Sequence, residues 1–169
     1  VIGDPTEGAL IVSAAKAGLL QDDLIEKYPR AEEIGFTSER KMMTTIHKIG
    51  KKEIAYSKGA PDVLIAKCSH ILINGKVKKL AKEDREKLLQ MNREFAQQAL
   101  RVLAFAYNPK LSKTPEKEMI FVGLQGMIDP PREEVKLAIE KCRTAGIKIV
   151  MITGDHEITA KAVAKEIGL

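Results

Sequence analysis

An apolar run near the end of the chain constrains the fold more than any other feature. Residues 147–152 read IKIVMI, and the sequence then passes through Thr153, Gly154 and Asp155 into a segment with helical spacing. A strand that is apolar along its length fits a parallel sheet covered by helices on both faces. One such strand cannot form a sheet, so the sequence predicts a partial α/β segment whose other strands are missing.

The elements around this strand are predicted to form an αβα unit. The character of the chain changes at Asp129, Pro130, Pro131 and Arg132, where two successive prolines stiffen the backbone and begin a helix. Gly146 ends that helix, the strand comes next at 147–152, and a second helix is predicted over 156–167. The predicted inward face of the first helix consists of Val135, Ala138, Ile139 and Cys142.

The earlier part of the chain predicts an α+β module with an antiparallel sheet and flanking helices. Its first segment begins as a helix, with Asp4 as N-cap, Pro5 at the first helical position and Glu7 at the capping-box spacing. Gly18 suits the C-terminal end of that helix. The runs AEEIGF and MMTTIHKIGKKEIAYSKGAP then predict strands, the second run forming a hairpin at Gly50-Lys51-Lys52.

A second hairpin, a long helix and two more strands complete this module. ILINGKVKKL predicts a hairpin that turns at Asn74-Gly75, and PDVLIAKC before it predicts a short helix begun by Pro61. VLAFAY and MIFVGLQGMI predict strands separated by the irregular loop NPKLSKTPEKE. KEDREKLLQMNREFAQQAL predicts an amphipathic helix whose buried stripe consists of Leu88, Met91, Phe95 and Ala99.

Composition places the chain among soluble globular proteins. Its 169 residues, 44% hydrophobic and 30% charged, suffice for one or two domains, and its short apolar stretches predict no membrane-spanning or secretory segment. Cys68 and Cys142 lie outside any CxxC or Cys/His cluster, so we expect neither a disulfide framework nor a zinc site, which favours a reducing compartment. The net charge of +5 fits either a polyanionic ligand or a well-solvated surface.

The turn after the apolar strand has the chemistry of a phosphate site. Ligands of open α/β sheets bind beyond the carboxyl ends of the strands, where the next helix N-terminus attracts anions. The Thr153 hydroxyl can donate to a phosphoryl oxygen, and Gly154 lets the backbone come close. Asp155 can cap the helix or steady a cation-bound phosphate. A well-capped βα turn explains the same three residues, and both interpretations stay open.

A phosphoryl-accepting nucleophile is harder to find. The one Asp-x-Thr pattern resembling such an aspartate is GDPTEG, with Asp4, Thr6 and Gly8, but only three residues precede Asp4 and no apolar strand leads into it. Asp4 instead stands at the start of a helix, so its capping role is favoured. The chain contains none of the patterns GxxxxGK[ST], GxGxxG, HExxH and GxSxG.

Six stretches together resemble the cytoplasmic part of P-type cation-transporting ATPases, most closely the calcium-pump-like branch. They are GDPTEGAL, FTSERKMMTTIH, YSKGAPD, ALRVLAFAY, MIDPPR and MITGDHEITAKAVAKEIG, and their order and spacing cover virtually the whole chain. The resemblance implies an α+β nucleotide-binding domain over residues 1–125. It implies an incomplete α/β segment of a haloacid-dehalogenase-like, Rossmann-type phosphorylation domain over residues 126–169.

The resemblance also implies a nucleotide site. Phe36 would stack on adenine, Glu7 would reach the polar edge of the base, and Arg101 would pair with phosphate. Stacking on an aromatic face is worth about 1–3 kcal/mol per base, and an arginine fork matches phosphate oxygens bidentately. Around these three residues, the residues that would line the pocket or let the nucleotide approach are Lys41, Lys58, Gly59, Ala60 and Leu103.

Each of these residues also has an ordinary structural explanation. Phe36 could be a core residue at a strand end, the lysines solvated charges, and Arg101 a cation lying over the sheet. Phe36 begins a polar run, unlike the other phenylalanines, and is therefore the best stacking candidate. Ser38 departs from the arginine common in animal relatives, which predicts a weaker or absent phosphate contact there.

The family pattern places the missing groups outside this chain. It has an Asp-Lys-Thr-Gly-Thr loop upstream and a Gly-Asp-Gly-x-Asn-Asp magnesium motif downstream, so no metal ligand is expected here. Asp129 to Arg132 would form the end of a hinge, and Thr153 to Asp155 would meet the transferred γ-phosphate of ATP. The chain would then bind ATP or ADP at the cytoplasmic face of a membrane, with Mg²⁺ used by the intact parent. Alone it would be inactive.

Two other functions stay open. One is a small haloacid-dehalogenase-like phosphatase with Asp4 as nucleophile. The other is a basic module that binds nucleic acid through the lysines of 41–52 and 76–87, against which the few aromatic residues argue. The resemblance favours the ATPase and implies no nucleic-acid partner. Its partners would be the missing phosphorylation, actuator and transmembrane domains, and the incomplete segment 129–169 could also pair or swap between chains.

Overall fold

The computed structural model describes residues 4–110, 114–128, 131–154 and 157–169. By its contacts the chain divides into two compact units, Val1–Leu89 with Leu103–Gln125, and Gln90–Val102 with Gly126–Leu169. In the described part of the chain, no helix is both long and apolar enough to cross a membrane. The elements in chain order are α1 (Pro5–Lys16), α2 (Gln21–Lys27), β1 (Arg30–Ile34), β2 (Met42–Ile49), β3 (Lys52–Gly59), α3 (Pro61–Lys67), β4 (Cys68–Ile73), β5 (Lys76–Lys79), α4 (Lys82–Gln97), β6 (Arg101–Asn108), β7 (Met119–Met127), α5 (Glu134–Thr144) and α6 (Glu157–Ile167).

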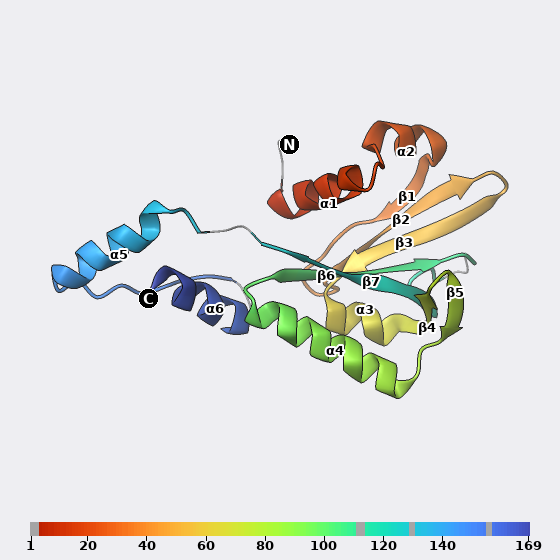
Figure 1. Cartoon of the computed structure of the whole chain (residues 1–169). Helices are drawn as coiled ribbons and strands as arrows, with labels where there is room; N and C mark the ends of the chain where they lie inside the picture. Colours follow the sequence, from red (N-terminus) through yellow and green to blue (C-terminus); the bar gives the residue numbers. More distant parts are fainter. Residues whose placement is uncertain (1–3, 111–113, 129–130, 155–156) are drawn as a thin grey trace. The chain divides into compact units, whose positions relative to one another are not determined.

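A seven-stranded sheet is the framework of the first unit. Its strand order is β1-β2-β3-β6-β7-β4-β5 (Figure 1). The pairs β1/β2, β2/β3, β3/β6 and β4/β5 are antiparallel, as predicted, but β4 and β7 are parallel. The sheet is therefore mixed, which corrects the expectation of an antiparallel one. β5, α4 and β6 separate β4 from β7 in sequence, and a connection of that length permits parallel pairing that no local pattern reveals.

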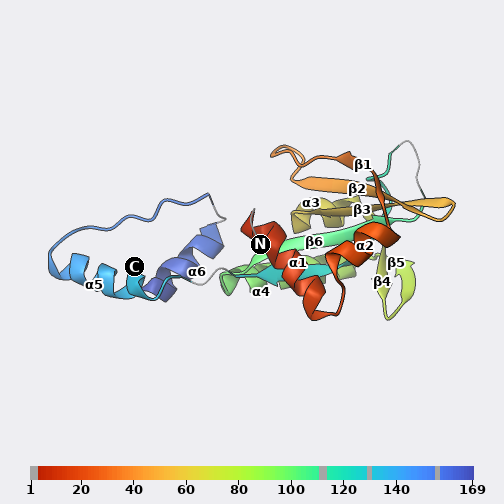
Figure 2. The same cartoon turned by 90° about the horizontal axis from the view of Figure 1, so that it is seen from above.

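One face of the sheet carries the hydrophobic core. Buried residues alternate along β2, so Met42, Thr44 and Ile46 face inward. They share this side with α3 and the first half of α4, which lie below the sheet in Figure 1. The core cluster contains Met42, Leu64, Ile65, Cys68, Ile71, Leu80, Ala104, Ala106, Met119 and Phe121, with Leu88 and Leu89 of α4 packed against it. α1 and α2 lie over the opposite face (Figure 2).

The local signals at the chain turns are confirmed. The Asp4 carboxylate caps α1 by accepting hydrogen bonds from the backbone N–H groups of Thr6 at 2.7 Å and Glu7 at 3.3 Å. Gly18, just past the end of α1, has a φ of 75°, which favours glycine. The β4–β5 hairpin turns at Asn74 and Gly75, with φ values of 49° and 74°, as a type I′ turn requires.

The predicted buried stripe of α4 is partly wrong. Leu88 and Phe95 are half-buried and Ala99 is buried, as predicted, but Met91 is 45% exposed, and Ala99 lies beyond the end of the helix with a φ of 58°. Arg85 accounts for part of the difference, because its guanidinium donates to the backbone carbonyls of Ile65 and Cys68. These bonds turn the Arg85 face of the helix inward and leave Met91 at its flank.

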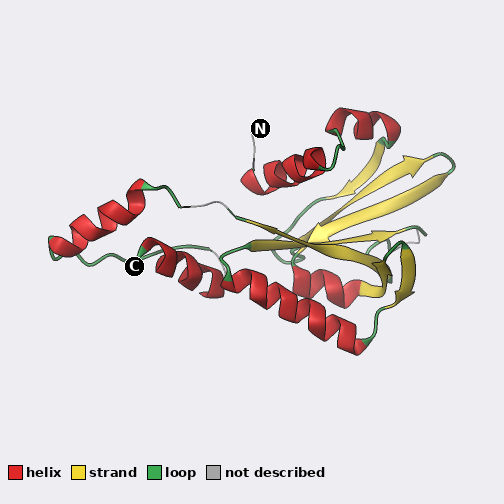
Figure 3. Cartoon of the chain, in the orientation of Figure 1, coloured by secondary structure: helices red, strands yellow, loops and turns green. Residues whose placement is uncertain are grey.

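The second unit contains α5 and α6 (Figure 3). Ile139 on α5 is buried, as predicted, and Val135 and Cys142 are half-buried, but Ala138 is exposed. α5 ends at Thr144, and Gly146 just beyond it has a φ of 72°, which lets the N–H of Ile147 donate to the carbonyl of Cys142 at 2.9 Å.

The predicted strand at 147–152 is wrong for this chain. These residues lie in an irregular connection, with Val150 70% and Ile152 94% exposed. A parallel strand is held by hydrogen bonds to strands beside it, and no described residue pairs with 147–152. The described residues therefore do not confirm the haloacid-dehalogenase-like part of the expected fold. The helix predicted over 156–167 is present as α6.

Candidate functional site

The sheet face under α1 and α2 carries most of the candidate residues. On β3, Ala55, Ser57 and Gly59 point into the core, so Tyr56 and Lys58 point to the other side. Lys58 stands opposite Met43 of β2 and Phe105 of β6. It is therefore a cation in the centre of a three-strand surface, between two apolar neighbours.

α1 brings a carboxylate to this cation. Glu7 lies in the first turn of α1, which Asp4 caps, and its Oε2 accepts a hydrogen bond from the Lys58 ammonium. The Lys58 side chain is 22% exposed and the Glu7 side chain 52% exposed. The Glu7 carboxylate is therefore accessible to water and to a ligand, while Lys58 is more covered.

A cavity of about 620 Å³ opens beside this pair. His47 and Tyr56 belong to its polar lining; their rings meet edge to face with centroids 5.6 Å apart, and His47 Nδ1 lies 2.8 Å from the carbonyl oxygen of Tyr28. Burial raises the pKa of Tyr56, and the nearby Tyr28 and Tyr107 raise it further. The remaining wall is mainly apolar and comes from Leu10, Ile11, Ala14, Leu19, Leu24 and Ile25 of α1, α2 and their connection.

The loop between β1 and β2 carries the predicted stacking residue. Phe36 is 62% exposed, which is unusual for a phenylalanine and leaves its ring accessible. Lys41 ends the loop with a φ of 51°, and its N–H donates to the Thr37 carbonyl at 2.8 Å. The Lys41 carbonyl accepts from the N–H of Ala60 at 2.9 Å. The structure thus brings Lys41 next to the Lys58-Gly59-Ala60 segment.

The close packing of two strands explains why position 59 is a glycine. A Cβ at this position would lie 2.5 Å from the Lys41 carbonyl oxygen and 2.6 Å from the Met42 Cβ. β2 and β3 approach so closely here that only glycine fits. The sequence suggested that Gly59 leaves room for a ligand, whereas the structure shows that it leaves room for the neighbouring strand.

The other residues predicted for the nucleotide site and the phosphate-facing turn lie on different elements. Leu103 is half-buried on β6, one residue before Ala104, which pairs with Gly59. Arg101 is exposed at the start of β6 and belongs to the second unit. Thr153 and Gly154 are exposed in the connection before α6.

Part of the predicted hinge and turn lies outside the described residues, namely Asp129, Pro130 and Asp155. Pro131 is half-buried and Arg132 exposed just before α5.

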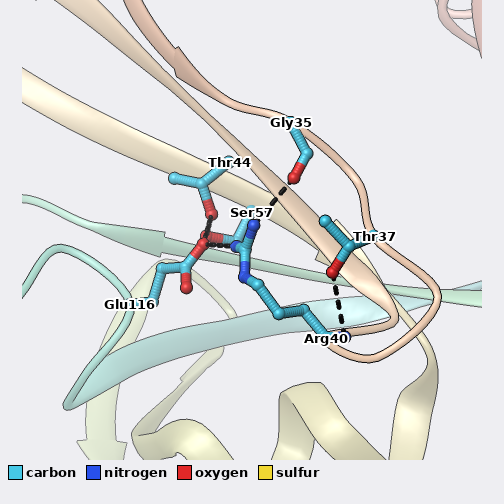
Figure 4. Close-up of polar contacts among 6 residues, drawn as sticks. All are labelled: Gly35, Thr37, Arg40, Thr44, Ser57 and Glu116. Carbon is cyan, nitrogen blue, oxygen red and sulfur yellow. Dashed lines mark hydrogen bonds and ion pairs between the residues drawn. The ribbon is translucent and has the colours of Figure 1, made fainter.

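Sequence reasoning missed a polar network beside the Phe36 loop. Arg40, Thr44, Ser57 and Glu116 converge there from the loop, β2, β3 and the segment before β7 (Figure 4). Arg40 stands within the motif FTSER, but its partner Glu116 is 76 residues away in a loop that the sequence marks only as irregular. No sequence signal linked the two.

The described residues do not fit a divalent metal. No group of three or more His, Cys, Asp or Glu side chains among them could hold an ion. The Mg²⁺ that the resemblance implies for the parent is therefore not assigned to this part of the chain. Cys68 and Cys142, both described, form no disulfide.

Comparisons with known proteins give the family. Residues 1–134 match the family model described as P-type ATPase, cytoplasmic domain N. The calcium-transporting ATPase 1 of Lactococcus lactis is 47% identical over 175 residues, which is all of this chain and 20% of that protein. The calcium-transporting ATPase of Bacillus subtilis is 47% identical over 174 residues, covering 99% of this chain and 20% of that protein.

A relative named for the transport of other cations is also similar over the whole chain. The sodium/potassium-transporting ATPase subunit alpha-1 of Oreochromis mossambicus is 37% identical over 187 residues, covering all of this chain and 18% of that protein. The chain thus spans about a fifth of the length of the relatives it matches. The family match covers 134 of the 169 residues. The chain therefore belongs to the P-type ATPase family, and the part that matches corresponds to cytoplasmic domain N.

Proposed function

We propose that this chain is the ATP-binding cytoplasmic segment of a P-type cation-transporting ATPase. One observation carries the proposal: in a chain that matches cytoplasmic domain N, Glu7 and Lys58 meet at one sheet face, with Lys41 hydrogen-bonded to the adjoining Ala60. Adenine nucleotides need an apolar surface for the base and cations for the phosphates, and this face offers both.

The resemblance assigns a role to each residue of the site. Phe36 stacks on the adenine, and Glu7 accepts a hydrogen bond from the base edge. Lys41 and Lys58 line the pocket, with Leu103 giving apolar contact and Arg101 pairing with phosphate. The exposed ring of Phe36 supports its part, because stacking requires an accessible aromatic face. The ion pair between Glu7 and Lys58 supports a shared site for those two residues. Gly59 and Ala60 complete the pocket wall through their backbone.

In this proposal the two parts of the chain have different functions. Residues 1–125 act as the nucleotide-binding domain, and residues 126–169 are the returning part of a haloacid-dehalogenase-like phosphorylation domain. Asp129 to Arg132 form the hinge, and Thr153, Gly154 and Asp155 face the γ-phosphate on its way to an aspartate outside this chain. The chain alone then neither becomes phosphorylated nor turns over ATP.

Calcium is the cation we propose for the parent protein. Several relatives at 44–47% identity are named calcium-transporting ATPases, against 37% for a sodium/potassium-transporting one. The site then lies at the cytoplasmic face of a membrane. The partners of the chain are ATP or ADP and the remaining domains of the parent, against which the exposed 147–152 segment would pack as a strand.

Calorimetric titration of the purified chain with ATP, ADP, AMP and GTP tests the proposal. We expect adenine nucleotides to bind in preference to GTP, Phe36→Ala to abolish most of the binding, and Phe36→Trp to retain it because the indole also stacks. Lys58→Ala should weaken binding, whereas Lys52→Ala, an exposed lysine of the same strand, should not. Equal binding of all four nucleotides, or Phe36→Ala binding like the wild type, would overturn the proposal.

A further inference from the structure

Arg40 bridges the loop that carries Phe36. The guanidinium Nη1 of Arg40 donates to the backbone carbonyl of Gly35 at 2.7 Å, and its backbone N–H donates to Thr37 Oγ1 at 3.2 Å (Figure 4). Phe36 lies between Gly35 and Thr37. Because its own side chain is 62% exposed, packing of the ring does little to fix its position, and the backbone around it must do so.

Glu116 anchors Arg40 to the sheet. Its Oε1 accepts from the Arg40 guanidinium and from the hydroxyl of Thr44 at 2.8 Å, and Thr44 shares a 2.7 Å hydrogen bond with Ser57. The side chains of Arg40 and Glu116 are only 30% and 16% exposed, and Thr44 is fully buried. Charge-assisted hydrogen bonds at this degree of burial are stronger and more directional than those at an open surface.

A buried asparagine shapes the turn that presents Glu116. The Asn108 Nδ2 donates to the carbonyls of Pro115 and Lys117, both at 3.1 Å, and its Oδ1 accepts from the N–H of Lys110 at 3.0 Å. The Lys117 N–H donates to the Thr114 carbonyl at 3.2 Å. Asn108 is 7% exposed at the end of β6, so the turn is bound to the end of a central strand.

We infer that Arg40 and Glu116 are positioning residues of the proposed nucleotide site. Asn108 holds the turn, Glu116 holds Arg40, and Arg40 holds the loop at Gly35 and Thr37, with Phe36 between them. A stacking residue that is already ordered loses less conformational freedom when the base binds, and affinity rises accordingly. This inference rests on the proposed function, since it concerns the same site.

The test compares ATP with the uncharged nucleoside adenosine. In the full chain, Glu116→Ala should weaken the binding of both ligands by about tenfold, the worth of one charge-assisted hydrogen bond. The affinity of Glu116→Gln for both ligands should lie between those of the wild type and Glu116→Ala, because the glutamine amide oxygen can still accept a hydrogen bond from Thr44. If Glu116 acted only through its negative charge, its removal would raise the affinity for the ATP anion and leave the affinity for uncharged adenosine unchanged. A loss of affinity for both ligands therefore indicates a positioning role.

A matched control removes a charge of the same sign from the loop that carries Phe36. Glu39 is exposed and takes no part in the network of Figure 4, so Glu39→Gln should leave adenosine binding unchanged. If Arg40 and Glu116 act through their contact, the double variant Arg40→Gln/Glu116→Gln should bind adenosine no more weakly than the weaker single variant. Amide ¹⁵N relaxation should show increased motion of residues 35–41 in Glu116→Ala, with far-UV circular dichroism unchanged.

The outcomes are distinguishable. If the wild type binds neither ATP nor adenosine, the proposed function itself is overturned. If the wild type binds and a folded Glu116→Ala stays within about twofold for both ligands, only the positioning role is overturned. Should Glu116→Ala fail to fold, Glu116→Gln decides by the same criterion.

Discussion

Glu7 and Lys58, 51 residues apart in sequence, form an ion pair between the first turn of α1 and the centre of the sheet. The pair joins a helix that packs over the sheet face to the strand beneath it. Because the Glu7 side chain is 52% exposed, water competes for its carboxylate. The contact therefore matters more for where the lysine points than for how stable the fold is.

Stability should respond little to the loss of this pair. Glu7→Gln is expected to lower the free energy of unfolding by less than about 1 kcal/mol, as for other partly exposed ion pairs. Urea unfolding followed by circular dichroism measures this, with Glu53→Gln, an exposed glutamate of β3, as control. A loss of several kcal/mol in Glu7→Gln alone would show that the pair is a structural support and not a ligand-accessible group.

Gly59→Ala should destabilise the chain strongly. The added methyl group would overlap the Lys41 carbonyl and the Met42 side chain, and such overpacking costs about 1–3 kcal/mol. Gly123 of β7 is the matched control, because none of the described atoms lies within 4 Å of a Cβ built there. Comparable urea midpoints for Gly59→Ala and the wild type would contradict the close approach of β2 and β3.

The two cysteines should differ sharply in reactivity. Burial raises the pKa of the Cys68 thiol to about 12, an effect that the nearby Arg85 partly offsets, and the thiol donates to the Leu64 carbonyl at 3.2 Å. Cys68 should therefore resist iodoacetamide at pH 8 until the chain unfolds, while the half-buried Cys142 is alkylated in the native state. Mass spectrometry of native and urea-unfolded samples checks this, and rapid native labelling of Cys68 would refute it.

The same thiol predicts a dependence of stability on pH. In the unfolded chain Cys68 ionises near its ordinary pKa of about 8.5, whereas in the folded chain it keeps its proton up to about pH 12. The unfolded state then binds fewer protons above pH 9, so the free energy of unfolding should fall as the pH rises from 9 towards 12. Cys68→Ala should show a shallower fall than the wild type, and equal slopes would exclude a contribution from this thiol.

Substitutions in the 147–152 segment test whether it is a strand in this chain. Ile152→Ser should change the free energy of unfolding by less than about 0.5 kcal/mol, because Ile152 is 94% exposed. Ile139→Ala should cost about 2–4 kcal/mol if α5 unfolds with the rest, because Ile139 is buried. A similar cost for both would mean that 147–152 is buried as a strand after all, for instance by pairing between two chains.

Local chemistry explains which parts of the fold could be predicted. The cap of α1 by Asp4 and the Asn74-Gly75 hairpin depend on neighbouring residues alone, and both are present. The parallel pairing of β4 with β7 depends on a long crossover connection, which the sequence pattern does not encode. The apolar spacing of 147–152 signals a strand, but a strand also needs partners, and the described residues supply none.

The candidate site divides in the same way. Family motifs point to Glu7, Lys41 and Lys58, and the structure brings Glu7 to Lys58 and Lys41 to Ala60. The link between Arg40 and Glu116 escaped prediction because it joins residues 76 apart through a loop without periodicity. Long-range polar contacts of this kind can be identified only from a three-dimensional structure.

The position at which ATP binds on this chain decides whether the proposed nucleotide site is correct. Amide ¹⁵N–¹H spectra of the wild-type chain, recorded during a titration with ATP, locate the site residue by residue. We predict that the largest shift changes fall on the 35–41 loop, the first turn of α1 and residues 56–60, and that Phe36→Ala removes them. Changes confined to other surfaces, such as the lysines of 76–82, or no changes at all at millimolar ATP, would contradict the proposed nucleotide site.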